Sequence, residues 1–149
     1  MAMVSKGFTL LELLITISII GILVAAGSVS FTTAQKRGRD ARRQGDIQTI
    51  QKSLEQCYIL ENKYPQQERL DFGEELICGD NKSIMSVVPE DPLAGANYYY
   101  TTDTDGLNYC LCAELERVGA GNANSSGNNG SCSFNKGSES NYYCVSNQQ

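Results

Sequence analysis

The side chains able to do chemistry in this 149-residue chain are mainly carboxylates and cysteines, because the sequence contains no histidine. Histidine is the usual acid–base group near neutral pH and the commonest metal ligand. The chain also lacks a G-x-S-x-G motif, a Walker-type phosphate loop and a G-x-G-x-x-G motif. Adjacent acids such as Glu74-Glu75 are typical of an exposed surface. The sequence therefore predicts that the chain is not an enzyme.

Six cysteines in so short a chain indicate disulfides formed in an oxidising compartment. They are Cys57, Cys78, Cys110, Cys112, Cys132 and Cys144. Six cysteines allow about 15 connectivities, and sequence alone does not choose among them.

Position along the chain narrows the choice of pairs. We favour Cys57–Cys78, because Cys57 lies near a predicted helix end and Cys78 in the following loop. Cys110 and Cys112 lie two apart in a predicted strand, so they face the same side and pair elsewhere, with the two downstream cysteines. Zinc is disfavoured, because C-x-C without C-x-x-C spacing or histidine is a poor zinc pattern. No metal ligand set is predicted from the cysteines.

Asp103-Thr104-Asp105-Gly106 resembles the start of a calcium loop but lacks the bidentate glutamate of an EF-hand. A plain turn between two strands is the preferred interpretation. We therefore expect no cofactor, with calcium at Asp103 and Asp105 as the alternative.

Residues 8–31 form a nearly unbroken apolar run whose only charge is Glu12. As a helix this run would span about 36 Å, enough to cross a bilayer core of roughly 30 Å. A carboxylate there costs on the order of 2–3 kcal/mol unless it is paired, so Glu12 is a functional candidate that needs a cationic partner. The alternative is a secretory signal peptide cleaved near VAAGS at 24–28, although 24 residues is long for a signal core.

Residues 32–62 are predicted to continue the same helix, because they contain no proline. Tyr64-Pro65 marks the end of the helix, because the residue before a proline avoids the helical conformation. Apolar side chains recur at helical spacing at Ile47, Ile50, Leu54 and Cys57/Tyr58. The first half of the helix would thus face lipid or other helices, and the second half would be amphipathic.

Residues 63–149 are predicted to form a globular head with a small antiparallel sheet. Three runs read as strands, Tyr98–Thr102, Tyr109–Leu115 and Tyr142–Val145, with a turn at 102–106. Residues 119–131 contain only Gly, Ala, Asn and Ser, which predicts a loop that buries no core and is mobile or functional. The fold class is therefore α+β, with segments 1–7, 8–31, 32–62 and 63–149.

Charge is unevenly distributed along a chain of net charge −5. Residues 32–52 carry six basic side chains against two acidic ones, whereas residues 53–149 carry a net −9. This contrast predicts that copies pack with complementary surfaces, and a solvated basic helix face is the alternative. Contact with DNA through Arg42 and Arg43 is a further candidate.

The run Gly7-Phe8-Thr9-Leu10-Leu11-Glu12-Leu13-Leu14-Ile15, after a short leader with Lys6, resembles the N-terminal signature of type IV pilins and type II secretion pseudopilins. The resemblance implies the type IV pilin fold. It also implies that a prepilin peptidase cuts between Gly7 and Phe8 and methylates the new terminus, so 1–7 is a cleaved leader. The apolar helix is then kept, and Glu12 pairs with the terminal amine of Phe8 in another subunit.

The likeness continues into the stem and the head. Arg39-Asp40-Ala41-Arg42-Arg43 looks like a pilin stem, and Val88-Pro89-Glu90-Asp91-Pro92-Leu93 before Tyr98-Tyr99-Tyr100 is similar to the Pro-x-Asp-Pro segment of major pseudopilins. One departure is the absence of proline in the distal apolar helix, where only Gly21 and Gly27 weaken it.

The implied function is a structural subunit of a type IV pilus or similar filament, used for adhesion, motility or DNA uptake. The alternatives are a pseudopilin that moves secreted proteins and a secreted or anchored cysteine-rich module. Implied partners are other copies of the chain, a prepilin peptidase, an inner-membrane assembly platform, membrane lipid before assembly, and surface ligands or DNA.

The predicted location is the cytoplasmic membrane, with the head outside, and then an extracellular pilus or periplasmic pseudopilus. The positive-inside rule alone would place the head inside, because five Lys/Arg follow the apolar run within 12 residues. We favour the outer side, because disulfides need an oxidising compartment.

Overall fold

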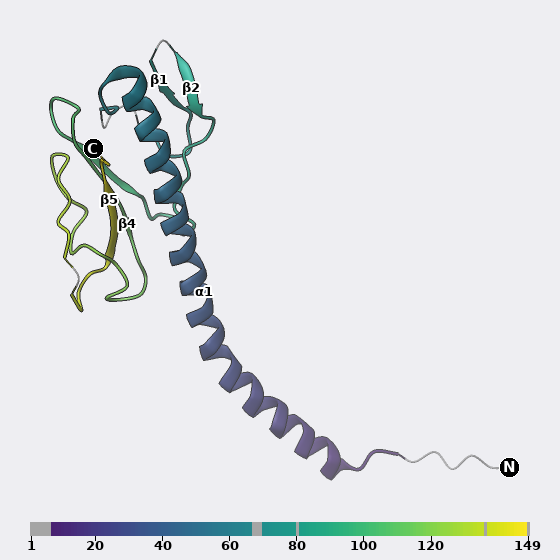
Figure 1. The fold of residues 1–149 in the computed structure, drawn as a ribbon. Coiled ribbons are helices and arrows are strands. Elements are labelled where there is room, and N and C mark those ends of the chain that lie inside the picture. The colour runs from purple at the N-terminus through teal and green to yellow at the C-terminus, as the bar shows by residue number, and fades with distance from the viewer. Residues whose placement is uncertain (1–6, 67–69, 80, 136, 149) are drawn as a thin grey trace. The chain divides into compact units, whose positions relative to one another are not determined.

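The computed structural model describes residues 7–66, 70–79, 81–135 and 137–148. Residues 1–6 of the predicted leader, including Lys6, lie outside the described residues. The chain divides into two compact units, an N-terminal unit, Met1–Gln35, and a head unit, Lys36–Gln149 (Figure 1).

A single helix, α1, runs from Leu10 to Glu61. It ends where Asn62 adopts a left-handed backbone with φ 53°, and the Asn62 N–H donates to the Tyr58 carbonyl at 2.7 Å. Asparagine tolerates this conformation better than most residues, which makes it a common helix terminator. The predicted continuous helix is confirmed, and its end differs from the prediction by one residue.

The second half of α1 supplies one side of the hydrophobic core of the head unit. Ile47, Ile50, Leu54 and Cys57 are fully buried, which confirms the amphipathic pattern seen in the sequence. They pack in one cluster with residues from the loops and strands: Tyr64, Leu70, Leu76, Cys78, Val88, Tyr98, Tyr100, Tyr109, Leu111 and Ala113.

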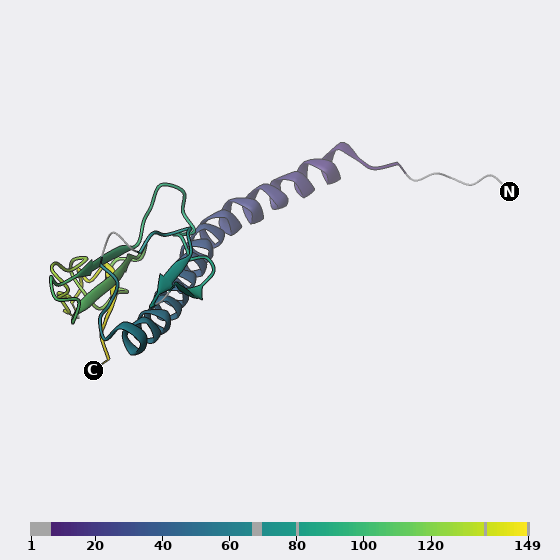
Figure 2. The ribbon, with the colours of Figure 1, turned by 90° about the horizontal axis from the view of Figure 1, so that it is seen from above.

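A three-stranded antiparallel sheet lies within the head unit (Figure 2). Its strands are β3 (Tyr99–Thr102), β4 (Tyr109–Glu114) and β5 (Tyr142–Ser146), in the order β3-β4-β5. All three strands were predicted, with ends that differ by one residue. The expected α+β fold of a long helix on a small disulfide-bonded antiparallel sheet is confirmed.

The central strand β4 is buried on both faces. Tyr109, Leu111 and Ala113 face the core shared with α1, whereas Cys110 and Cys112 belong to a second cluster with Ala123 and Cys144. Successive strand residues point to opposite faces, so this alternation follows directly from the sequence Tyr-Cys-Leu-Cys-Ala. One strand therefore serves two cores.

A second, two-stranded sheet was not predicted. It pairs β1 (Leu76–Cys78) with β2 (Lys82–Met85) in antiparallel register. The strands are three and four residues long, and β2 begins with two exposed residues before two half-buried ones. Elements this short carry too little alternation to be recognised from sequence.

The loop 119–131 is packed, which corrects the expectation that it buries no core. Ala123 is fully buried and forms isolated bridges to Phe134 and Tyr142. The composition argument failed because small residues let the loop backbone come very close to its neighbours. A Cβ atom added at Gly121 would lie only 2.2 Å from the Tyr142 carbonyl oxygen, and one at Gly127 2.6 Å from Cys110 Sγ.

We predict that Gly121→Ala destabilises the head by about 1–3 kcal/mol, because the added methyl group overlaps the β5 backbone. Gly137→Ala is the matched control, because the nearest atom to its added Cβ is 3.8 Å away. Urea unfolding of the oxidised full chain in detergent, followed by circular dichroism, measures both. Equal midpoints for the two variants would contradict the close packing of this loop.

Candidate processing and assembly site

The start of α1 is a reciprocal hydrogen-bonded cap formed by Thr9 and Glu12. The Thr9 N–H and hydroxyl each donate to Glu12 Oε2 at 2.9 Å, and the Glu12 N–H donates to Thr9 Oγ1 at 3.2 Å. This is the capping-box arrangement, in which Thr at the N-cap and Glu three residues later satisfy amides that a helix start leaves free. In the part of the chain that the structure describes, Glu12 has no ion-pair partner.

The apolar half of α1 is exposed along its length. Phe8 is 85% exposed and Phe31 65%, and the leucines and isoleucines between them are exposed on every side of the helix. Among the described residues, this is one helix long and apolar enough to cross a membrane, with a mean hydropathy of 2.4 over its most apolar window. Such a surface is unstable in water, so lipid or other helices must cover it.

Gly7 precedes the helix and is not required by the fold. A Cβ atom added at Gly7 would meet no heavy atom within 4 Å. Packing in the described structure therefore does not require glycine at position 7. Recognition of Gly7 and Phe8 by a processing enzyme would explain it.

Residues 3–28 match the family model of the prokaryotic N-terminal methylation motif. No curated protein and no solved structure matches the chain. The matched segment contains Gly7, Phe8 and Glu12, and it is the class III signal of type IV pilins and pseudopilins. It supports a pilin-like or pseudopilin subunit that is processed by a prepilin peptidase and self-assembles. Together with the apolar helix, the motif indicates membrane anchoring before assembly.

The first turns of α1 in the head unit carry a buried ion-pair cluster centred on Arg43. Arg43 Nε and Nη2 donate to the two carboxylate oxygens of Asp91 at 2.7 and 2.8 Å. Both side chains are only 2% exposed. Arg43 Nη1 also lies 3.2 Å from Asp40 and 3.3 Å from Glu116. The bidentate pair ties α1 to the segment that follows β2.

A second layer closes the cluster. Arg39 Nη2 donates to Glu116 at 2.8 Å, Arg117 Nε donates to Asp40 at 3.1 Å, and the Glu116 N–H donates to Asp40 at 2.9 Å. The hydrogen bond from Arg39 lowers the pKa of the Glu116 carboxyl to about 2, and the charge of Arg43 acts in the same direction. Three guanidinium groups and three carboxylates thus neutralise one another, as buried charges require.

This cluster corrects the interpretation of the stem as a free basic surface. Arg39 and Arg43 are occupied inside the head unit, so Arg43 is not accessible to DNA or to a neighbouring copy. Arg42, its predicted partner in DNA contact, is 64% exposed and lies 3.7 Å from Asp46. The exposed cations of the stem are Lys36, Arg37, Arg42 and Lys52.

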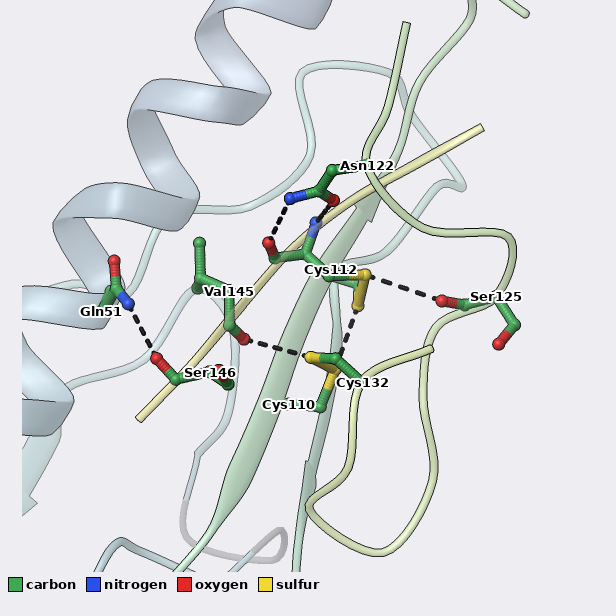
Figure 3. The surroundings of a disulfide bond; sticks show 9 residues. Gln51, Cys110, Cys112, Asn122, Ser125, Cys132, Val145 and Ser146 are labelled. Carbon is green, nitrogen blue, oxygen red and sulfur yellow. Dashed lines mark hydrogen bonds between the residues drawn. A yellow bond between two sulfur atoms is a disulfide. The ribbon is translucent and has the colours of Figure 1, made fainter. Parts of the chain in front are cut away.

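Four of the cysteines form two bridges on the outer face of β4 (Figure 3). These bridges are Cys110–Cys132 and Cys112–Cys144, whose order the sequence left open. The third bridge, Cys57–Cys78, is the favoured pair and lies in the core shared with α1. The sulfur atoms of Cys110 and Cys112 lie 3.4 Å apart. Asn122, which the sequence analysis missed, binds both the N–H and the carbonyl of Cys144 through its side chain.

The predicted turn at 102–106 is held by Asp103. Its carboxylate accepts the Leu107 N–H at 2.8 Å and the Asn108 side-chain amide at 2.7 Å. Gly106 completes the turn with φ 71°. Asp105 is exposed. These bonds give Asp103 a structural role in the turn, and calcium binding by Asp103 and Asp105 stays a prediction.

We predict that Arg43→Ala costs about 3–5 kcal/mol of head stability, because Asp91 would be left buried without its ion-pair partner and Asp40 would keep only Arg117. Arg42→Ala is the matched control on the adjacent residue and should change stability by less than about 0.5 kcal/mol. Urea unfolding of the full chain in detergent, monitored by tyrosine fluorescence, compares them. Similar losses for both variants would refute a special role for Arg43.

Proposed function

We propose that this chain is a structural subunit of a type IV pilus or a similar filament that serves adhesion, motility or DNA uptake. A prepilin peptidase cuts between Gly7 and Phe8 and methylates the Phe8 amine, and the apolar half of α1 then polymerises. The observation that carries the proposal is the methylation motif at 3–28 on an exposed apolar helix that continues into a folded head.

The exposed apolar surface supplies the driving force for assembly. Residues 8–31 are held by lipid before assembly, with the head outside the cytoplasmic membrane. Lipid tails are as apolar as leucine, so helix association in the filament depends on close packing and on polar pairs. Small residues along this segment, including Gly21 and Gly27, allow helices to approach closely.

Glu12 supplies the polar pair. Cleavage after Gly7 creates an amine at Phe8, four residues before Glu12. In a free subunit, Thr9 satisfies the Glu12 carboxylate. In a filament, the amine of another copy gives it a cationic partner, and the need to place both groups together sets the register of adjacent subunits.

A pseudopilin of a type II secretion system is the second candidate, and one observation favours it. The segment Val88–Leu93, which resembles the Pro-x-Asp-Pro segment of major pseudopilins, delivers Asp91 to Arg43. The residue of this segment that pairs with Arg43, Asp91, is thus part of the motif that resembles major pseudopilins. In that case the filament is periplasmic, and its task is to move secreted proteins.

The mature N-terminus tests the proposal. We expect fibres sheared from cells to contain a chain that begins at N-methylated Phe8 and gains about 6 Da on reduction of three bridges. Intact and peptide masses, measured before and after reduction, check this. A chain that begins near Ser28 would instead indicate a secreted cysteine-rich module, and a retained leader would contradict processing after Gly7.

Two variants separate the charge of Glu12 from its role in the helix cap. We expect Glu12→Gln to lower the yield of sheared fibres by more than about tenfold, because each subunit contact loses its charged pair. Glutamine still accepts the hydrogen bonds of Thr9. Thr9→Val keeps the charge but removes the hydroxyl, and it should assemble nearly normally.

The yield is compared with membrane-bound subunit on immunoblots, with non-reducing gels to show that the head is folded. The reverse ranking of the two variants would overturn the pairing argument and assign Glu12 to capping alone.

A further inference from the structure

The head unit contains a cleft of about 400 Å³ at one end of the three-stranded sheet. Its walls come from the start of β4, the end of β5 and the loop that carries Cys132. The lining residues are Asn108, Asn129, Gly130, Ser131, Cys132, Phe134, Ser146 and Asn147. The filament proposal assigns no role to this cleft.

The lining carries amides, hydroxyls and one aromatic ring, but no charged side chain. Phe134 is 54% exposed, so one face of its ring is accessible to a ligand. Within the described ranges, the side chains of Asn129, Ser131 and Ser146 have no hydrogen-bond partner. The Asn147 amide donates to Asn108 Oδ1 at 3.3 Å. Polar groups free to bind a ligand therefore surround an accessible apolar face.

A disulfide and a close backbone contact hold the walls of the cleft in place. The Cys110–Cys132 bridge anchors one wall to β4, and Cys132 Sγ lies 3.4 Å from the Val145 carbonyl (Figure 3). Gly130 adopts φ 73°, and an added Cβ would lie 2.5 Å from the Asn108 carbonyl oxygen. A site whose polar groups are already positioned loses less entropy when it binds a ligand.

The cleft also lies at the end of the head unit away from the ion-pair cluster. β4 begins where Tyr109 contacts Tyr64, just beyond the end of α1, and runs to Glu114, next to the Arg39 and Arg43 contacts of Glu116. Because Cys110 is paired with Ser146 across the sheet, the cleft belongs to the end of β4 near the end of α1.

We propose that this cleft binds a neutral saccharide. A pyranose ring presents C–H groups on one face, which stack on an aromatic ring, and hydroxyls around its edge, which pair with amides and serine hydroxyls. The absence of lining charge disfavours phosphates, nucleic acids and acidic sugars, which require cations. The Asp103 carboxylate, which contacts the lining residue Asn108, already accepts bonds from Leu107 and Asn108. This proposal does not depend on polymerisation.

The absence of tryptophan from the chain allows a direct test. Phe134→Trp keeps an aromatic face in the cleft and introduces a single indole. Val118→Trp is the matched control, because Val118 is 76% exposed and lines a different cavity near Arg43. Both full-length variants are purified in lauryl dimethylamine oxide, which has no sugar headgroup, and are excited at about 295 nm, where tyrosine absorbs little.

The probes are lactose, maltotriose and di-N-acetylchitobiose, with sialyllactose as the charged comparison. We expect at least one neutral probe to shift the emission of Phe134→Trp saturably, with a dissociation constant on the order of millimolar. Val118→Trp should not respond. Adding Asn147→Ala to Phe134→Trp should weaken binding by about threefold to tenfold through loss of a hydrogen bond.

Three results would overturn the proposal. The first is no saturable response of Phe134→Trp to any neutral probe, with disulfides intact by mass. The second is tighter binding of sialyllactose than of lactose, which would show that charge is recognised. The third is a concentration-dependent emission shift without sugar that is absent from Val118→Trp, which would show that the cleft is occupied by a second copy of the chain.

Discussion

The buried guanidinium of Arg43 is the interaction on which the arrangement of the head depends. A cation that is 2% exposed is stable only if carboxylates reach it with good geometry. Asp91 and Glu116 come from segments that are 48 and 73 residues away in the chain. Both segments must therefore converge on the same turn of α1. This requirement positions the connection that leads into β3 and the chain that leaves β4, so the sheet is aligned along the helix from that end.

The other end of the sheet is held by different forces. Tyr64 and Tyr109 donate to the two oxygens of Glu55 at 2.9 and 3.2 Å, and the rings pack edge to face with centroids 4.6 Å apart. Burial is the main cause of the raised pKa of both tyrosines, and the bonds to Glu55 add to it. The helix therefore meets the sheet through charge at one end, aromatic packing at the other and aliphatic residues between them. The outer face of β4 is left to the disulfides and to a loop of small residues.

The sequence predicted those features that repeat along the chain, and it missed those that depend on distant partners. The buried series Ile47, Ile50, Leu54 was readable because its period is helical. The role of Asp91 was not, because an Asp between two prolines shows no sign of an arginine 48 residues earlier. For the same reason, the sequence predicted an exposed basic surface on the stem and missed the ion pairs of Arg39 and Arg43. The spacing of Thr9 and Glu12 is that of a capping box, so the cap could have been predicted from the sequence. The sequence analysis instead predicted only a cationic partner for Glu12 in another subunit.

That cap changes what assembly must achieve at Glu12. A carboxylate in an apolar environment is costly when its oxygens lack donors. Here the Thr9 amide and hydroxyl already donate to one oxygen, Oε2, and both residues would remain after the proposed cleavage between Gly7 and Phe8. Thr9 thus lowers the cost of holding Glu12 in the membrane before assembly. In the proposed filament it would also lower the gain on docking, since a neighbour's amine would add to an oxygen that is partly satisfied. On that proposal the charge of Glu12, rather than the number of its hydrogen bonds, favours the assembled state.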